Sequence, residues 1–247
     1  MDVLVENYNP QATEDDGSCW DSDIDYVISS SYATGLFDAG AAEIVDYHAG
    51  TQRIFSVNAA DLNVSAIDAS DPNNLTLAFT IDVTAYGATA NSVAVFGDHV
   101  AVAIEAAEVD ALGQVVIFDV NGNFVSAAPT GYWPDALSVS FDGTMIAVAN
   151  EGQPSDDYTI DPVGSATLID VTDPANPVAT QIEFDGLTEA DLPEGTRIFG
   201  PNATIAMDLE PEYFAFSGDD NTLFISCQEN NCMVVADVAT ATITNVW

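Results

Sequence analysis

Short apolar stretches that alternate with polar residues dominate the chain, and this period-two pattern is typical of β-strands. Four of these stretches run directly into a carboxylate or carboxamide side chain. They are RIFSVNAA reaching Asn58, HVAVAIEA reaching Glu105, MIAVANEG reaching Asn150 and Glu151, and TLFISCQEN reaching Gln228 and Glu229. The recurrence of one strand pattern with one type of ending indicates an internal repeat.

The spacing of these strand ends predicts the architecture. From Asn58 to Glu105 is 47 residues and from Glu105 to Asn150 is 45, whereas from Asn150 to Gln228 is 78. A period of about 40–50 residues with several strands per unit is the signature of β-propeller blades. We therefore expect an all-β fold, a β-propeller with blades at about 40–85, 90–130, 134–185 and 210–247. The long last interval leaves room for an insert at 186–209.

Repeated turn sequences support the same division. The dipeptide Asp-Pro follows a strand at Asp71-Pro72 and again at Asp173-Pro174, within the similar phrases AIDASDPNN and LIDVTDPAN. Asn121-Gly122 between two apolar runs is a strong hairpin signal. Helices are hardly indicated, and Leu187–Leu192 is the best candidate for one helical turn.

Residues 1–25 differ from the rest because they are acidic, rich in turn residues and almost free of strand pattern. Asp21, Asp23 and Asp25 alternate as in the first half of a calcium loop, but the glycine and the distal glutamate of an EF-hand are missing. A solvated acidic linker is the alternative. The stretch from Asn7 to Cys19 resembles thrombospondin type 3 calcium repeats, a resemblance that implies a disulfide from Cys19 to an upstream cysteine.

The charge of the chain restricts its partners. Forty acidic residues stand against two basic ones, Arg53 and Arg197, which gives a formal net charge of −38. This excludes nucleic acid and anionic membrane surfaces as partners, and the lack of lysine excludes a P-loop or a Schiff base. Candidate ligands are cations or neutral groups, although many of the acids can serve solubility alone. No apolar run is long enough to cross a bilayer, and the start MDVLVENYNP lacks the features of a signal peptide.

Longer phrases carry a family resemblance over about Ser30–Trp247. TGLFDAGAAEIVDY, YWPDALSVSFDG, VANEGQPSDDYTIDPVGSATLIDV, RIFGPNATIAMDLEPEYFAFS and QENN resemble the choice-of-anchor I family of secreted bacterial propeller proteins. That family is related to a mesenchyme-specific cell-surface glycoprotein and is sometimes labelled alkaline phosphatase-like. The resemblance implies a seven-bladed propeller of the YVTN type with a C-terminal anchoring segment, and an extracellular or cell-surface location. About four of the seven blades would be present here, with the remaining blades downstream. It implies no settled catalytic residues.

Propeller geometry suggests where ligands could bind. Residues at equivalent strand ends of successive blades lie on one face, and clustered oxygen ligands suit calcium rather than zinc. The candidate metal ligands are Glu105, Glu151 and Glu229 at strand ends, Asp156 and Asp157 in a loop, and Asp208, Glu210 and Glu212 near the insert. Asn58, Asn150 and Arg197 are candidate ligand contacts. The alternative for the strand ends is structural hydrogen bonding.

Both arginines are expected to be held by several carboxylates in bidentate pairs. Alternatively, Arg197 binds a phosphate or carboxylate ligand beside a bound cation. The histidines His48 and His99 fall in hairpin turns, which speaks against a zinc site or a catalytic triad. Cys227 and Cys232 flank a four-residue turn at opposed hairpin positions, which predicts a disulfide, with two buried free thiols as the alternative.

These observations favour a non-catalytic extracellular module that binds or adheres and is stabilised by calcium. Its partner would be an unknown protein, glycan or small molecule. One alternative is a calcium-dependent phosphatase or phosphodiesterase that uses an all-oxygen metal cluster. Another is a purely structural propeller platform.

Overall fold

The computed structural model describes residues 28–247, which form four four-stranded antiparallel sheets, each meandering through consecutive strands. We call these sheets blades 1 to 4. Blade 1 contains β1 (Val45–His48), β2 (Arg53–Asn58), β3 (Asn63–Asp68) and β4 (Thr76–Asp82), with a 3-10 turn η1 (Ala59–Asp61) after β2. Blade 2 contains β5 (Ala90–Phe96), β6 (His99–Ile104), β7 (Leu112–Asp119) and β8 (Phe124–Tyr132). Blade 3 contains β9 (Pro134–Val139), β10 (Met145–Asn150), β11 (Ser165–Asp170) and β12 (Val178–Glu183), and blade 4 contains β13 (Tyr213–Phe216), β14 (Thr222–Cys227), β15 (Cys232–Asp237) and β16 (Thr242–Val246).

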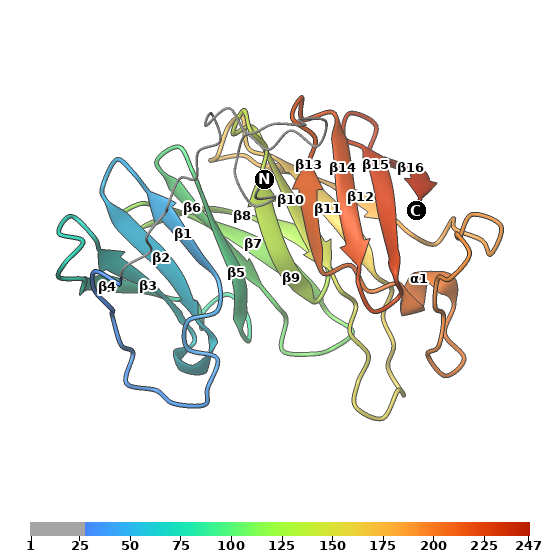
Figure 1. The fold of residues 1–247 in the computed structure, drawn as a ribbon, viewed down its shortest axis with the longest axis horizontal. Coiled ribbons are helices and arrows are strands. Elements are labelled where there is room, and N and C mark those ends of the chain that lie inside the picture. Colours follow the sequence, from blue (N-terminus) through green and yellow to red (C-terminus); the bar gives the residue numbers. More distant parts are fainter. Residues whose placement is uncertain (1–27) are drawn as a thin grey trace, which may run out of the picture.

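The blades lie side by side in chain order, as Figure 1 shows from the blue blade to the red one. The first strands of neighbouring blades contact each other, β1 with β5, β5 with β9 and β9 with β13. This arrangement confirms the predicted all-β fold and the four propeller blades. The predictions for residues 1–25, including Cys19, Asp21, Asp23 and Asp25, lie outside the described residues.

Three apolar cores hold the blades together, one at each blade-to-blade contact. Blades 1 and 2 share a core around Phe55 and Val100, and blades 2 and 3 share one around Ile117 and Ile146. The third core joins blades 3 and 4 and also contains Leu209 from the insert. Each fully buried large apolar side chain in such a core stabilises the fold by about 1.5–3 kcal/mol. Strand alternation therefore supplies one apolar face to each neighbouring blade.

The segment between blades 3 and 4 contains the helix α1 (Ile205–Asp208), which Figure 1 shows at the lower edge of blade 4. The helical turn predicted at Leu187–Leu192 is wrong. There the Asp191 carboxylate accepts hydrogen bonds from the Thr188 amide at 2.9 Å and its hydroxyl at 2.6 Å, which closes a non-helical turn. Such local side-chain bonding competes with helix formation.

Hydrogen bonds at repeated positions connect a strand to the turn of the following blade. The Ser126 hydroxyl on β8 donates to the carbonyl of Pro174 in blade 3 at 2.6 Å. The Ser29 hydroxyl, ahead of blade 1, donates to the carbonyl of Pro72 at 2.9 Å. Pro72 and Pro174 hold the same place in the two repeated Asp-Pro phrases. The segment at Ser29 therefore contacts blade 1 much as the outer strand of blade 2 contacts blade 3.

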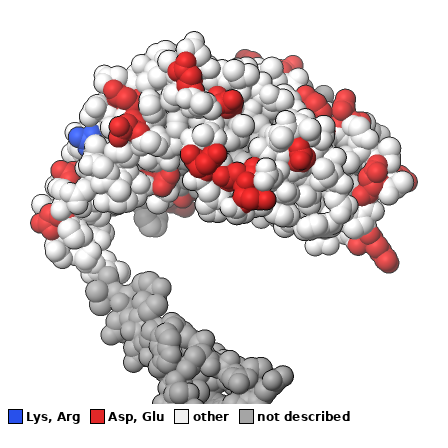
Figure 2. Space-filling model, turned by 90° about the horizontal axis from the view of Figure 1, so that it is seen from above, with Lys and Arg blue, Asp and Glu red and all other residues white. Residues whose placement is uncertain are grey.

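Acidic residues are spread over the surface rather than confined to one end. Figure 2 shows them interspersed with uncharged surface on the upper face, with one denser group near its centre and basic atoms at a single place at the edge. Among the described residues the one contact between a basic and an acidic side chain within ion-pair distance joins His48 Nε2 to Asp98 Oδ1 at 3.4 Å. The Arg53 guanidinium instead donates to the Val120 carbonyl at 2.8 Å and lies over the Phe79 ring. The expected pairing of both arginines with carboxylates is therefore wrong for the described part of the chain.

Candidate functional site: the acidic corners of blades 2 to 4

In each blade the second strand ends beside the start of the first strand, because the two strands are antiparallel. We call this meeting point the corner of the blade. The first-strand and second-strand side chains at the corners are Asn91 and Glu105 in blade 2, Asp135 and Glu151 in blade 3, and Glu212 and Gln228 in blade 4. The sequence pattern identified the second member of each pair, while the first member completes the site.

The corners of blades 2 and 4 each combine one carboxamide with one carboxylate. Asn91 Nδ2 donates to Glu105 Oε2 at 3.2 Å and also to the Pro134 carbonyl of blade 3 at 3.1 Å. Gln228 Nε2 donates to Glu212 Oε2 at 2.8 Å. In both corners the carboxylate accepts a hydrogen bond from the neighbouring carboxamide. These two corners fit the structural alternative of the sequence analysis.

The corner of blade 3 contains two carboxylates and no carboxamide. Removal from water, followed by repulsion from Glu212, Glu43 and Glu105, raises the Asp135 pKa to about 6. Removal from water, followed first by repulsion from Asp135, raises the Glu151 pKa to about 8. Burial and like charge both disfavour the ionised form, and no donor offsets them here. Ionising Asp135 and Glu151 in this corner therefore costs free energy.

Blade 4 brings further acids to the same place. Burial, then repulsion from Glu229, raises the Glu210 pKa to about 7, and Glu210 in turn acts on Glu151. We call the mutually repelling group the acidic cluster; its members are Asp135, Glu151, Glu210, Glu212 and Glu229. Glu105 is connected to the acidic cluster because it repels the Asp135 carboxylate. The neighbouring Asp161 also has a raised pKa, caused by burial and by repulsion from Asp208.

A buried asparagine stands at the base of the blade 3 corner. Asn150 is 0% exposed, and its Nδ2 donates to Ser165 Oγ at 3.1 Å and Thr167 Oγ1 at 2.9 Å. Its Oδ1 has no donor among the described residues. A Cβ on Gly131 of β8 would lie within 2.7 Å of Asn150, so blade 2 packs against it with no room for a side chain. Asn150 is thus fixed from two sides and is not positioned by solvent.

Three predicted ligands serve the fold. Asp208 is 5% exposed, and its carboxylate accepts hydrogen bonds from the backbone amides of Phe199 at 2.7 Å and Gly200 at 2.5 Å. The buried Asn58 accepts from the Asp61 amide at 3.2 Å and caps η1. Asp157 accepts from the Thr159 hydroxyl at 2.7 Å, which lowers its pKa. These contacts satisfy their oxygen atoms within the protein.

Of the remaining predicted positions, Asp156 lies apart from the acidic cluster, whereas Arg197 lies beside one of its members. Asp156 is exposed in the loop after β10, and that loop does not contribute to the raised Glu151 pKa. Arg197 lies in the insert, where it shares the lining of a cavity with Glu229. Its guanidinium forms no ion pair with any described residue.

Cys227 and Cys232 lie directly opposite each other in the β14–β15 register. Both are buried free thiols, and a hydrogen bond with Cys232, followed by burial, raises the pKa of Cys227. The structure thus shows the two cysteines placed opposite each other, which is the reason for predicting a disulfide. It also shows them as free thiols, which is the alternative prediction. The bond itself stays a prediction for oxidising conditions.

Sequence reasoning missed Asp135 and Asn91. The search for repeated strand ends followed second strands only, whereas Asp135 and Asn91 stand at the starts of first strands. The antiparallel pairing of a hairpin was the signal that could have found them, since each strand end must have a strand start beside it.

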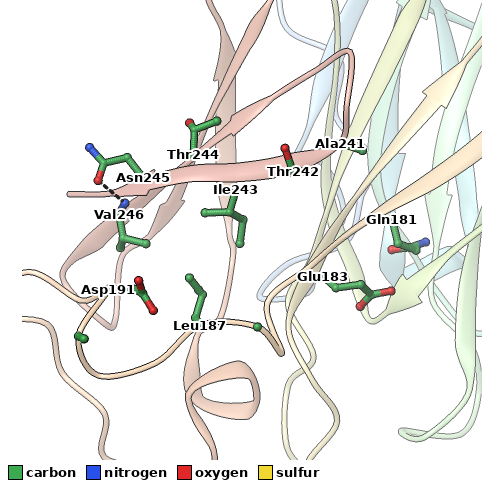
Figure 3. A pocket seen from close by; sticks show the side chains of 12 residues that line it. Gln181, Glu183, Leu187, Asp191, Ala241, Thr242, Ile243, Thr244, Asn245 and Val246 are labelled. Carbon is green, nitrogen blue, oxygen red and sulfur yellow. Dashed lines mark hydrogen bonds between the residues drawn. The ribbon is translucent and has the colours of Figure 1, made fainter.

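A cavity of about 660 Å³ lies between the outer strands of blades 3 and 4, and Figure 3 shows the side chains that line it. Leu187 and Ile243 supply apolar surface, while the Asp191 carboxylate is occupied by Thr188. Asn245 Oδ1 accepts from the Val246 amide at 3.0 Å. With these polar groups already partnered, the cavity is best described as a gap between two splayed strands.

Among residues 28–247, no three acidic, histidine or cysteine side chains already surround a common point as metal ligands would. Any cation at the acidic cluster therefore has to draw the carboxylates together. The described residues contain no helix of the length and apolar character needed to span a membrane.

The fold and the acidic corners define a β-propeller module that presents carboxylates at the corners of its blades. The chain belongs to the choice-of-anchor I family, whose domain model matches residues 43–247. No curated protein matches the chain.

Solved structures with related folds are propellers of greater length. The chain is similar to the Cps50 (Swd1) β-propeller domain of Myceliophteria thermophila, with a TM-score of 0.55, 12% identity, and 87% of this chain and 57% of that chain covered. A functionally unknown protein from Desulfotomaculum acetoxidans gives a TM-score of 0.56 at 8% identity, covering 85% and 56%. A putative 6-phosphogluconolactonase from Bacteroides uniformis gives 0.52 at 10% identity, covering 83% and 53%. The chain spans about half the length of these structures, which at such identities show the fold alone.

Proposed function

We propose that this chain is part of a non-catalytic binding module of a secreted or cell-surface protein and that its acidic cluster takes up a hard divalent cation such as calcium. Membership of the choice-of-anchor I family and the propeller fold support a non-catalytic module, and the family supports the location. The carboxylate pair of blade 3 is the observation that carries the cation proposal. Calcium accepts six to eight oxygen ligands in flexible geometry, which carboxylates and carbonyls supply.

The comparison between corners explains why a cation belongs in blade 3. In blades 2 and 4 a carboxamide donor stands beside each carboxylate, at 3.2 Å and 2.8 Å. In blade 3 Asp135 stands where blade 2 has Asn91 and Glu151 stands where blade 4 has Gln228, so the two carboxylates repel each other. A cation between them would replace the missing donor and cancel the repulsion from Glu210 and Glu229. The bound cation would then bridge blades 3 and 4 where these carboxylates meet.

Thermal unfolding with and without calcium tests this proposal. At about pH 8 calcium at a hundredfold excess over its Kd should raise the Tm by about 5–10 °C. Glu151→Gln and Asp135→Asn, which keep shape and remove charge, should abolish that rise. Asp156→Asn, which removes an exposed acid from the adjacent loop, is the matched control and should leave it intact. A calcium-induced rise that persists in Glu151→Gln, or that is absent from the natural chain, would refute the cation site.

The alternative of a calcium-dependent phosphatase or phosphodiesterase has its own test. Such an enzyme needs a metal-activated water and a basic group that contacts the phosphate. Arg197 is the candidate for the phosphate contact. Calcium-dependent cleavage of a generic phosphate ester that is lost in Glu151→Gln would replace the non-catalytic proposal. Calcium stabilisation without any cleavage would support the binding module.

A further inference from the structure

Hydrogen bonds clamp the backbone of the loop Gly195–Gly200. The Arg197 amide donates to the Asn230 carbonyl at 2.8 Å, and Asn230 Nδ2 donates back to the Arg197 carbonyl at 3.0 Å. The Phe199 and Gly200 amides donate to the carboxylate of Asp208. Asn230 is 0% exposed and Asp208 5%, so water does not compete for these bonds. The loop therefore has a fixed shape without any ligand.

The same loop points its larger side chains outward. Phe199 is 56% exposed, Ile198 is 39% exposed and Arg197 is exposed. Together with Thr196 and Glu229 they line an open cavity of about 670 Å³. That volume is in the range of ligand pockets, and exposed apolar groups on a rigid support are typical of binding sites. Preorganisation of this kind lowers the entropic cost of binding.

Arg197 is unusual because the described residues leave its charge unpaired. The chain has 40 acidic residues and two basic ones, and Arg53 is occupied by the Val120 carbonyl and the Phe79 ring. No described carboxylate lies within ion-pair distance of Arg197. A guanidinium presents a planar fork of donors that fits a carboxylate. The loop thus offers one anion-binding group beside two apolar side chains.

The surroundings restrict which anion can bind. Glu229 lines the same cavity and Glu210 lies close enough to Glu229 for mutual repulsion. With a net charge of −38 on the chain, a ligand that is only anionic would be repelled before it reached Arg197. A ligand that carries an ammonium group as well satisfies both signs.

We propose that the loop Gly195–Gly200 recognises a short peptide that carries both a carboxylate and an ammonium group. The peptide carboxylate pairs with Arg197, an apolar side chain packs on Ile198 and Phe199, and an ammonium group lies toward Glu229. This site lies beside the acidic cluster and shares Glu229 with it. Its contacts through Arg197, Ile198 and Phe199 do not require a cation at Asp135 and Glu151.

Binding of the dipeptide Lys-Leu with free termini, followed by backbone amide shifts in nuclear magnetic resonance spectra, tests the proposal. The titration is carried out with the full 247-residue chain at about pH 7.5 in the presence of a calcium chelator. The amides of Arg197, Ile198 and Phe199 should shift and saturate with a Kd of about 1 mM. Lys-Leu amide, which lacks the carboxylate, and acetyl-leucine, which lacks the lysine with both of its ammonium groups, should each bind about fivefold more weakly.

Variants assign the contacts. Arg197→Gln should weaken Lys-Leu about fivefold, and Arg197→Lys should restore part of the loss. Glu229→Gln should remove the preference for Lys-Leu over acetyl-leucine. Glu194→Gln removes an equal charge from the same insert outside the cavity lining and should change nothing.

Three outcomes would overturn the proposal: no shift at Arg197–Phe199 up to about 10 mM dipeptide, equal binding of Lys-Leu and its amide, or unchanged binding in Arg197→Gln. Because Glu151→Gln leaves this loop intact, that variant should bind Lys-Leu as the natural chain does. Failure of the cation site and failure of the peptide site are thereby told apart.

Discussion

The aspartates of the hairpin turns and the carboxylates of the acidic cluster carry the same chemical group in opposite environments. The turn aspartates each accept hydrogen bonds from hydroxyl, amide or backbone donors up to four residues away, and their pKa values are lowered; they include Asp82, Asp119, Asp142, Asp157, Asp170, Asp219 and Asp237. Asp135, Glu151 and Glu210 lie among other acids, and their pKa values are raised. The difference separates acids whose hydrogen bonds stabilise the fold from acids that repel one another.

The comparison also predicts opposite responses to pH. Hydrogen bonds to the charged form lower the Asp219 pKa to about 2, so its contribution to stability is present above the ordinary pKa of 3.8 and is lost as the pH falls through 2. Glu151 is favoured in its neutral form, so its contribution is present below 4.5 and is lost as the pH rises through 8. Stability without calcium should therefore decline from about pH 5 to pH 8, a decline that thermal unfolding across this range would measure.

Asp208→Ala is expected to have the largest effect. Asp208 lies near the acids of the cluster, but its buried carboxylate accepts hydrogen bonds from backbone amides, as the turn aspartates do. Removing its carboxylate leaves the Phe199 and Gly200 amides without an acceptor. We expect a loss of about 2–4 kcal/mol in the free energy of unfolding, measured by urea denaturation. A loss below about 0.5 kcal/mol would place Asp208 with the unpartnered acids instead.

Asn91→Asp would convert the corner of blade 2 into a copy of the corner of blade 3. The change removes the donors to Glu105 and to the Pro134 carbonyl and adds a like charge. We expect a loss of about 2 kcal/mol at pH 8 and a smaller one at pH 4, where both carboxyls are more protonated. Equal losses at the two pH values would show that the change in stability comes from packing and not from charge.

Glu151→Gln makes the reverse change in blade 3. It should stabilise the calcium-free chain by about 1 kcal/mol at pH 8 once solvent screening is allowed for, and by nothing below pH 4.5. Urea denaturation at the two pH values measures the difference. Glu189→Gln, an exposed acid of the insert, controls for the general loss of negative charge.

Asp142→Asn should have the smallest effect of the four. Its Oδ1 accepts from the Ser140 hydroxyl at 2.8 Å and from the Thr144 hydroxyl at 2.7 Å, in a fully exposed turn. We expect a slightly lower Tm at pH 7 and a smaller difference as the pH falls and the natural carboxyl takes up a proton. A raised Tm at pH 7 would remove the distinction between turn and cluster acids.

The fold could be predicted because period-two alternation and the repeat length are local properties that survive in the tertiary structure. The corners could be predicted only in part. Glu105 and Glu151 follow from strand ends, but the contrast between blades depends on which residue starts the neighbouring strand, as Asn91 and Asp135 show. The structural role of Asp208 depends on the Phe199 and Gly200 amides, which loop geometry brings near it. Asn58, by contrast, caps a turn through the Asp61 amide three residues later, which is a local interaction.

Asn230 has a consequence for the motions of the insert. This one buried side chain accepts from the Glu210 amide at 3.0 Å and donates to the carbonyls of Arg197 and Asp208. It also lies in the turn between β14 and β15. The insert and this turn therefore cannot open separately without stranding polar atoms away from water. Their amide protons should exchange with solvent as one unit, and a disturbance of either segment will be felt in the other.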